Sequence, residues 1–195
     1  IHGFSFFHSL GMVLGDKLFE EISKIIAKDY YNISETNYNV EGDISNEALA
    51  KIREIIHDLG RKKKDIKKRY PDIYQEIKEV LNQNKNRIHH ITQLSDIYLR
   101  KDNTEIFVEV KTVKPDKDQS IESKDKLLKI AAIKNKSVKL LLVFPYNPYF
   151  PNKYKWSFPL NYFKEQHDLL IGKDWWDYIG GEGTYEELLK IFEEA

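Results

Sequence analysis

Apolar and polar residues alternate in two short stretches near the middle of the chain, within LSDIYLRKDNTEIFVEVKT. Leu94 to Leu99 and Glu105 to Val113 are rich in β-branched and aromatic residues, and a polar turn centred on Asp102 and Asn103 separates them. This arrangement predicts a β-hairpin. Because side chains alternate between the two faces of a strand, one face of the hairpin is expected to be wholly apolar. Its members are Ile97, Leu99, Ile106, Val108 and Val110.

Helical spacing of apolar residues dominates the flanking segments. Residues 4–31 are predicted to form one amphipathic helix whose buried stripe repeats at helical spacing. The stripe consists of Leu10, Leu14, Leu18, Ile22 and Ile25. Ser45 is a good N-cap for a helix over about 46–59, which Gly60 ends. Pro71 is expected to begin a third helix that reaches about Leu81, and a Lys-rich helix is predicted over 120–135.

The remaining segments divide into loops, a buried strand and a helical tail. A loop is expected from Asn32 to Asp43, and residues 82–92 fit either a loop or an extra strand. The nearly continuous apolar run VKLLLVFPY, residues 138–146, predicts a strand buried in a mixed sheet. A strand, a helix and a second strand in this order predict a parallel crossover connection.

Length and composition bound the fold. A chain of 195 residues, 41% hydrophobic and 32% charged, is typical of one globular domain with a substantial core. We therefore expect a single α/β domain over residues 1–195, in which helices flank a mixed sheet. A helical, basic subregion is expected at 45–87, before the hairpin, and a helical C-terminal subregion at 152–195.

Composition also narrows the chemistry and the location. The chain has no cysteine, which excludes disulfides, cysteine nucleophiles and thiolate metal sites. Any metal must be held by oxygen or imidazole, and a hard ion such as Mg²⁺ fits best. No apolar run approaches the roughly 20 residues needed to span a bilayer, and no secretory signal is visible. We expect a cytoplasmic protein with no membrane partner.

The net charge of zero hides two oppositely charged regions. Residues 51–69 are strongly basic, whereas residues 174–195 carry seven acids and one lysine. The densest basic run is predicted to contact phosphates, the alternative being a solvated helix surface. It contains Arg61, Lys62, Lys63, Lys64, Lys67, Lys68 and Arg69. Lys126, Lys129 and Lys134 are further candidates to line a cleft for a polyanion.

Charged residues on the polar face of the hairpin are the candidate chemistry. If Asp102 and Asn103 are the two turn residues, Asp96 lies opposite Glu109, and Lys111 shares their face. Two close carboxylates repel each other, so a bound divalent cation is the natural way to reconcile them. The alternative is a solvent-facing surface with a salt-bridging lysine, which explains the flanking aromatic residues less well.

The spacing of Asp96, Glu109 and Lys111 resembles the signature of the PD-(D/E)xK nucleases, with Ser95 where proline is common. The opening SLGMVLGDKLFEEISKIIA and the ending LIGKDWWDYIGGEGTYEELLKIFEEA resemble type II restriction endonucleases of the TdeIII group. This resemblance implies Mg²⁺-dependent, sequence-specific cleavage of duplex DNA by a homodimer, at a short palindrome of the GGNCC kind. A cognate DNA methyltransferase is the implied functional partner, and a prokaryote is the implied source.

The resemblance suggests a role for each residue. Asp96 and Glu109, with the backbone carbonyl of Val110, would hold Mg²⁺, and Lys111 would orient or deprotonate the attacking water. A second ion would recruit an acid from the first helix. Alignment selects Glu20 for this role, whereas the helical wheel favours Glu21.

Two other classes of protein stay open at this stage. One is a different nuclease of the same superfamily, such as a junction resolvase or a repair or transposition endonuclease. The other is a non-catalytic protein that only binds nucleic acid, although the intact Asp96, Glu109 and Lys111 argue against it. For a homodimer, we expect the acidic C-terminal segment to form part of the interface, with Trp175 and Trp176 as anchors.

Overall fold

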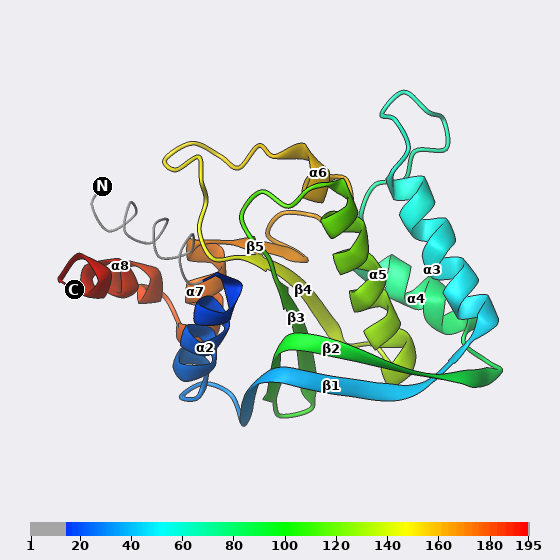
Figure 1. Ribbon diagram of the computed structural model, residues 1–195, viewed down its shortest axis with the longest axis horizontal. Helices are drawn as coiled ribbons and strands as arrows, with labels where there is room; N and C mark the ends of the chain where they lie inside the picture. Colours follow the sequence, from blue (N-terminus) through cyan, green and yellow to red (C-terminus); the bar gives the residue numbers. More distant parts are fainter. Residues whose placement is uncertain (1–14, 195) are drawn as a thin grey trace.

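Five strands form one mixed sheet in the order β1-β2-β3-β4-β5 in the computed structural model, which describes residues 15–194. The strands are β1 (Ile33–Ser45), β2 (Arg87–Lys101), β3 (Thr104–Val110), β4 (Lys139–Phe144) and β5 (Leu169–Ile171). β1, β2 and β3 are antiparallel neighbours, whereas β3, β4 and β5 run parallel to one another. Figure 1 shows β1 and β2 as a long two-stranded arm that extends beyond the rest of the sheet. The predicted mixed sheet is confirmed.

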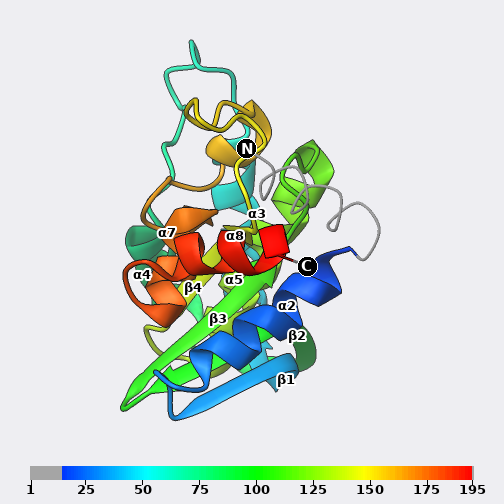
Figure 2. The same cartoon turned by 90° about the vertical axis from the view of Figure 1, so that its left-hand side faces the viewer.

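Helices cover both faces of this sheet. They are α2 (Asp16–Ala27), α3 (Asn46–Leu59), α4 (Ile73–Gln83), α5 (Lys117–Lys134), α6 (Ser157–Leu160), α7 (Lys173–Gly180) and α8 (Thr184–Glu194). α5 packs along the sheet together with α3 and α4, and α7 packs between α2 and α8. The turned view in Figure 2 shows α2 running beside the sheet, where it contacts β1, β2 and β3. None of the helices within residues 15–194 combines the length and apolar character needed to cross a membrane.

The predicted hairpin is confirmed in its register. Lys101 pairs with Thr104, and the pairing continues to Ile97 and Val108 around a turn at Asp102, whose φ is 52°. All five members of the predicted apolar face are at most 3% exposed. β2 begins at Arg87, so most of the ambiguous segment 82–92 belongs to a strand. The parallel connection from β3 through α5 to β4 is also confirmed.

The loop predicted from Asn32 to Asp43 is wrong, because this segment forms β1. β1 is an edge strand of the sheet and, among residues 15–194, pairs only with β2, so its outward positions can be polar. Positive φ values at Asn37 and Gly42 also interrupt the alternation that would reveal a strand. The segment resembles a loop in composition, and long-range pairing decides its structure.

The predicted apolar stripe of the first helix is wrong at Ile25 and holds at Ile22, which packs partly buried against the core. Leu10 and Leu14 lie outside the described residues, and Ile25 is 62% exposed. The buried face of α2 instead consists of Phe19, Glu20, Ser23 and Ala27. The Ser23 hydroxyl donates to the Phe19 carbonyl and accepts from the Trp175 indole at 3.0 Å. Ser23 thus joins the buried face of α2 to α7, while Ile22 and Ile26 pack partly buried against the core.

Capping residues determine where the central helices begin. Ser45 accepts from the Ala48 N–H and Gly60 follows Leu59, so the predicted bounds of α3 are confirmed. α4 begins after Asp72 and not at Pro71, because the Asp72 side chain accepts from the backbone N–H of Gln75. α5 starts at Lys117, three residues before the predicted start, because Asp116 and Gln119 form a capping box.

Candidate active site

The side chains of β1 switch from one face of the sheet to the other at a point opposite Asp96. The Thr36 hydroxyl donates to Glu21 of α2 at 2.7 Å, whereas Tyr38 stacks on Tyr98, with ring centroids 4.1 Å apart, on the side covered by α5. Residues two apart share a face in a regular strand. The change therefore occurs at Asn37, whose φ of 54° lies in the left-handed region.

Regular alternation along β2 directs Asp96 toward α5, on the same face as Tyr98. Asp96 lies opposite Asn37, between two paired positions of the ladder. The hydroxyl of the neighbouring Ser95 donates to the Ile97 carbonyl at 2.8 Å and accepts from the Val108 N–H at 3.2 Å. Ser95 thus ties β2 to β3 with a hydroxyl that the proline common in related motifs would lack.

The three predicted residues meet on this face. Asp96 Oδ2 accepts from the backbone N–H of Val110 at 2.8 Å, which fixes the carboxylate beside β3. Lys111 Nζ lies 2.9 Å from Glu109 Oε1. Lys126 Nζ of α5 lies 3.1 Å from Asp96 Oδ1 and also contacts Glu109 Oε2. The two carboxylates therefore face one shared positive charge.

Burial controls the protonation of this cluster. Glu109 is 2% exposed, so burial raises its pKa; Asp96 raises it further, while Lys126 and Lys111 oppose the shift. Burial alone would lower the pKa of Lys111, but the negative charges of Glu109 and Asp96 outweigh it and the net shift is upward. Lys111 therefore holds its proton in this state, as an ammonium paired with Glu109.

The structure separates the two candidate acids of the first helix. Glu20 is buried, and burial followed by repulsion from Asp96 and Asp16 raises its pKa to about 7. Glu21 is exposed and accepts a hydrogen bond from the Thr36 hydroxyl. Glu20 is therefore the acid whose charge faces the site. Sequence reasoning missed Asp16, which accepts from the Thr112 backbone and interacts with Lys111 and Asp96. The signal was present, since residues four apart share a helix face.

The free energy of unfolding should depend on Glu20 in a pH-dependent manner. The folded pKa of about 7 exceeds the ordinary value of 4.5, so only the folded state keeps the proton between these values. Stability therefore falls as pH rises through this window, and the loss is complete above it. Glu20→Gln removes this contribution and should stabilise the metal-free protein at about pH 8 but not at about pH 4.

Urea denaturation in the presence of a chelator measures this difference at the two pH values. Glu21→Gln is the matched control, because it removes the neighbouring, exposed carboxylate. Equal effects of the two substitutions would contradict the assignment of Glu20 to the buried cluster.

The carboxylate pair fits a divalent cation in its donor chemistry. Within residues 15–194, no three His, Asp or Glu side chains come together as a ready-made metal cage. Asp96 and Glu109 nevertheless share one cation, the Lys126 ammonium, so their oxygens can face a common positive charge. Mg²⁺ is usually bound by one or two carboxylates, with waters and substrate phosphates completing its shell.

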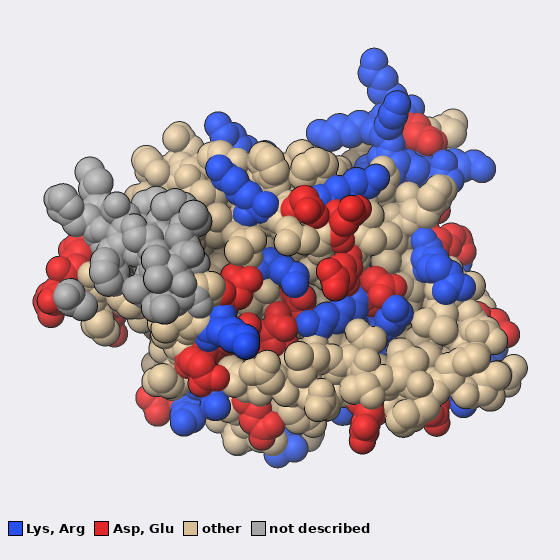
Figure 3. Space-filling view, viewed as in Figure 1, with Lys and Arg blue, Asp and Glu red and all other residues tan. Residues whose placement is uncertain are grey.

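The predicted phosphate-binding run lies in the loop between α3 and α4, and it is not helical. Figure 1 shows this loop projecting from the body, and Figure 3 shows mainly lysine and arginine side chains there. Three of its seven basic side chains are engaged: Arg61 with Asp58 and Asp65, Lys68 with the Leu59 carbonyl, and Arg69 with Glu79. The others are exposed and have no ion-pair partner within the described part of the chain. They are Lys62, Lys63, Lys64 and Lys67.

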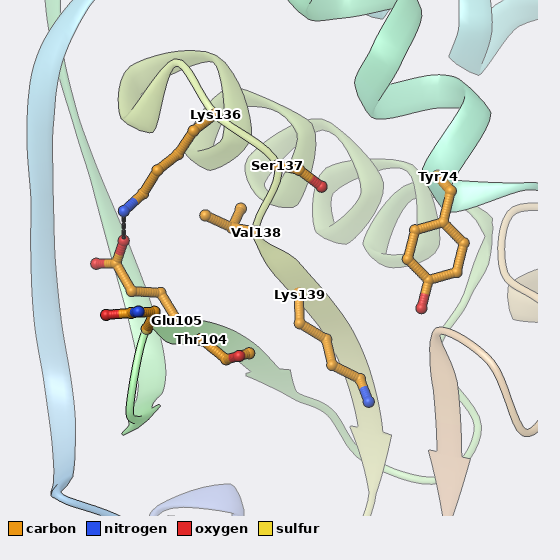
Figure 4. Close-up of a pocket in the computed structure, with 8 residues that line it drawn as sticks. Tyr74, Thr104, Glu105, Lys136, Ser137, Val138 and Lys139 are labelled. Carbon is orange, nitrogen blue, oxygen red and sulfur yellow. Dashed lines mark ion pairs between the residues drawn. The ribbon is translucent and has the colours of Figure 1, made fainter.

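A separate hollow of about 290 Å³ lies at the other end of the hairpin. Figure 4 shows Tyr74, Ser137 and Lys139 around it and Glu105 joined to Lys136. Glu105 also pairs with Lys134 and accepts from the Tyr98 hydroxyl. Its one acid is thus paired with two lysines, so this hollow lacks the two converging carboxylates of the Asp96–Glu109 cluster.

Comparisons with known proteins agree with this geometry. The whole chain, residues 1–195, matches the family described as Type II restriction endonuclease, HinfI. The type II restriction enzyme HgiBI of Herpetosiphon aurantiacus is 32% identical over 198 residues, which cover 97% of this chain and 70% of the relative. HgiCII of the same organism is 30% identical over 97% of this chain and 71% of its own length.

A more distant relative comes from an archaeon. MjaII of Methanocaldococcus jannaschii, also a type II restriction enzyme, is 25% identical over 95% of this chain and 52% of its own length. No solved structure matches the chain significantly.

A mixed sheet whose hairpin gathers two acids and a lysine is consistent with the PD-(D/E)xK nucleases, and the protein is a type II restriction endonuclease, a site-specific deoxyribonuclease. More narrowly, the chain belongs to the HinfI family of these enzymes. The class predicted from the sequence is confirmed, whereas membership of the TdeIII group stays a prediction.

Proposed function

We propose that this enzyme hydrolyses both strands of duplex DNA at a short palindrome, with Mg²⁺ held by Asp96, Glu109 and the carbonyl of Val110. The observation that supports it is the convergence of both carboxylates on one positive charge beside Lys111. When bound, the ion polarises the phosphoryl group and lowers the pKa of a bound water. Lys111 orients that water and offsets the charge that develops on the phosphate.

The target sequence and the biological partner extend this proposal. The resemblance to the TdeIII group supports a palindrome of the GGNCC kind, and a cognate methyltransferase would protect the host DNA. Digestion of a plasmid with Mg²⁺ or with a chelator tests the activity. Discrete fragments with Mg²⁺ alone are expected. A smear would instead indicate a nuclease without sequence choice, and intact plasmid would refute the proposal.

The loop lysines should set DNA affinity without setting sequence choice. Lys62→Gln, Lys63→Gln and Lys64→Gln together should weaken binding to cognate and non-cognate duplexes alike. For each phosphate that the variant no longer neutralises, the slope of log affinity against log salt should also fall by about 0.9, because fewer counterions are released. Fluorescence anisotropy at several salt concentrations measures this slope.

A matched triple variant controls for the change in net charge. Lys28, Lys101 and Lys190 are exposed and lie outside the loop, so their replacement by glutamine removes the same charge elsewhere. If both triple variants change the salt slope equally, the loop has no special place in the DNA interface.

The enzyme is proposed to act as a homodimer, at least on DNA. One site of this kind cuts one strand, and a two-fold protein matches a palindromic target. Light scattering with and without a cognate duplex should detect two protomers per duplex. A monomer that makes double-strand breaks in one binding event would overturn the two-fold arrangement.

The predicted tryptophan anchors of the dimer interface are wrong. Trp175 and Trp176 are 1% and 0% exposed, and their indoles donate to Ser23 and to the Pro145 carbonyl. They belong to the core because α7 packs between α2 and the sheet edge. An interface through the C-terminal segment would have to use α8, on which Ile191 is 60% exposed.

A further inference from the structure

Lys126 occupies the position between the two acidic side chains. Its ammonium lies 3.1 Å from Asp96 Oδ1 and contacts Glu109 Oε2, and its side chain is 17% exposed. Lys111, by contrast, approaches Glu109 through the other oxygen, Oε1. Lys111 therefore lies beside the two acids, whereas Lys126 lies between them.

The backbone that carries Lys126 is firmly held. Its neighbours Leu127 and Leu128 are 1% and 0% exposed, and Lys124, slightly earlier on the same helix, is fully buried between two acids. The capping box at Asp116 fixes the start of this helix. Only the flexible four-carbon side chain of Lys126 is therefore able to move without disturbing α5.

We propose that Lys126 is a resident counter-ion that fills the cation position in the metal-free enzyme, yields it when the divalent ion binds, and then contacts the DNA phosphate. The pairing of two close carboxylates requires a positive charge, and Lys126 supplies it before the metal does. An ammonium and a divalent ion repel each other strongly at the same oxygens. The phosphate is the new anion within reach of the displaced side chain. The contact of Lys126 with the DNA phosphate rests on the proposed DNA cleavage.

Metal binding without DNA tests the counter-ion role of Lys126. Lys126→Met removes the competing cation, so the DNA-free protein should bind Mg²⁺ or Ca²⁺ about tenfold more tightly or better, as measured by calorimetry. Lys129→Met is the matched control, because Lys129 lies one turn along the same helix and pairs with Asp125 outside the cluster. Unchanged or weaker metal binding by Lys126→Met would overturn the counter-ion role.

The stability of the protein in urea tests the counter-ion role of Lys126 independently. In a chelator, Lys126→Met should unfold at lower urea concentration than the wild type, and Ca²⁺ should restore the midpoint. If the variant fails to fold without metal, Lys126→Gln replaces it, since the amide still donates hydrogen bonds but carries no charge. A midpoint that Ca²⁺ does not restore in either variant would show that Lys126 serves only the packing of α5.

Single-turnover cleavage at saturating Mg²⁺ tests the contact of Lys126 with the DNA phosphate. Lys126→Met should cleave at least about tenfold more slowly despite its tighter metal binding. A wild-type rate would overturn the phosphate contact and leave the counter-ion role standing on calorimetry. If the wild type binds the ion but cuts no DNA, the proposed function fails, and the comparison of Lys126→Met with Lys129→Met still decides the counter-ion role.

Discussion

Glu109→Ala is expected to abolish DNA cleavage while leaving DNA binding largely intact. Glu109 is buried in the cluster, and one of its oxygens faces the cation position that it shares with Asp96. Removing it deletes a ligand of the proposed ion but no contact of the basic loop with phosphates. The rate should fall by on the order of 10³-fold or more, as when a preorganised electrostatic group is removed. Asp96→Ala should behave in the same way.

Cleavage assays and anisotropy measurements on the same duplex separate the two effects. Glu105→Ala is a matched control, because Glu105 is an acid of the same strand that pairs with Lys134 and Lys136 at the far end of the hairpin. It should retain cleavage. Substantial Mg²⁺-dependent cleavage by both Glu109→Ala and Asp96→Ala would place the active site elsewhere.

Local sequence signals were sufficient for the hairpin and for the bounds of α3. The Asp102–Asn103 turn fixes the register of β2 and β3, so the approach of Asp96 to Glu109 follows from counting residues. Ser45 likewise fixes the start of α3. Both features depend on residues only a few positions apart, which is the range over which sequence patterns are informative.

Features that depend on long-range packing could not be predicted. β1 is polar in composition, and only its pairing with β2 shows it to be a strand. Lys126 looks like other lysines of its helix until α5 is laid across the hairpin, which brings it to Asp96 and Glu109. Asp16 could have been found from its spacing to Glu20, but nothing local indicates that α2 turns this face toward the site.

The burial of Lys124 also depends on long-range packing. Of the substitutions proposed, its replacement should cause the largest loss in the free energy of unfolding. It is fully buried, and its ammonium lies 2.8 Å from Glu76 Oε2 of α4 and 3.1 Å from Asp168 Oδ2, just before β5. The two acids are 0% and 1% exposed, and each also accepts a backbone N–H. The three charges therefore join α4, α5 and the segment that leads into β5.

Lys124→Ala should lower the free energy of unfolding by about 3–5 kcal/mol, because it leaves two buried carboxylates without their shared cation. That decrease is a large part of the roughly 5–15 kcal/mol that stabilises a typical domain. Urea denaturation measures it, with Lys129→Ala on the same helix as the surface control. Adding Glu76→Gln and Asp168→Asn to Lys124→Met should recover much of the stability, since no buried charge then remains unpaired. If Lys124→Ala is no more costly than Lys129→Ala, the triad does not hold α5 in place, and the rigid support inferred for Lys126 fails with it.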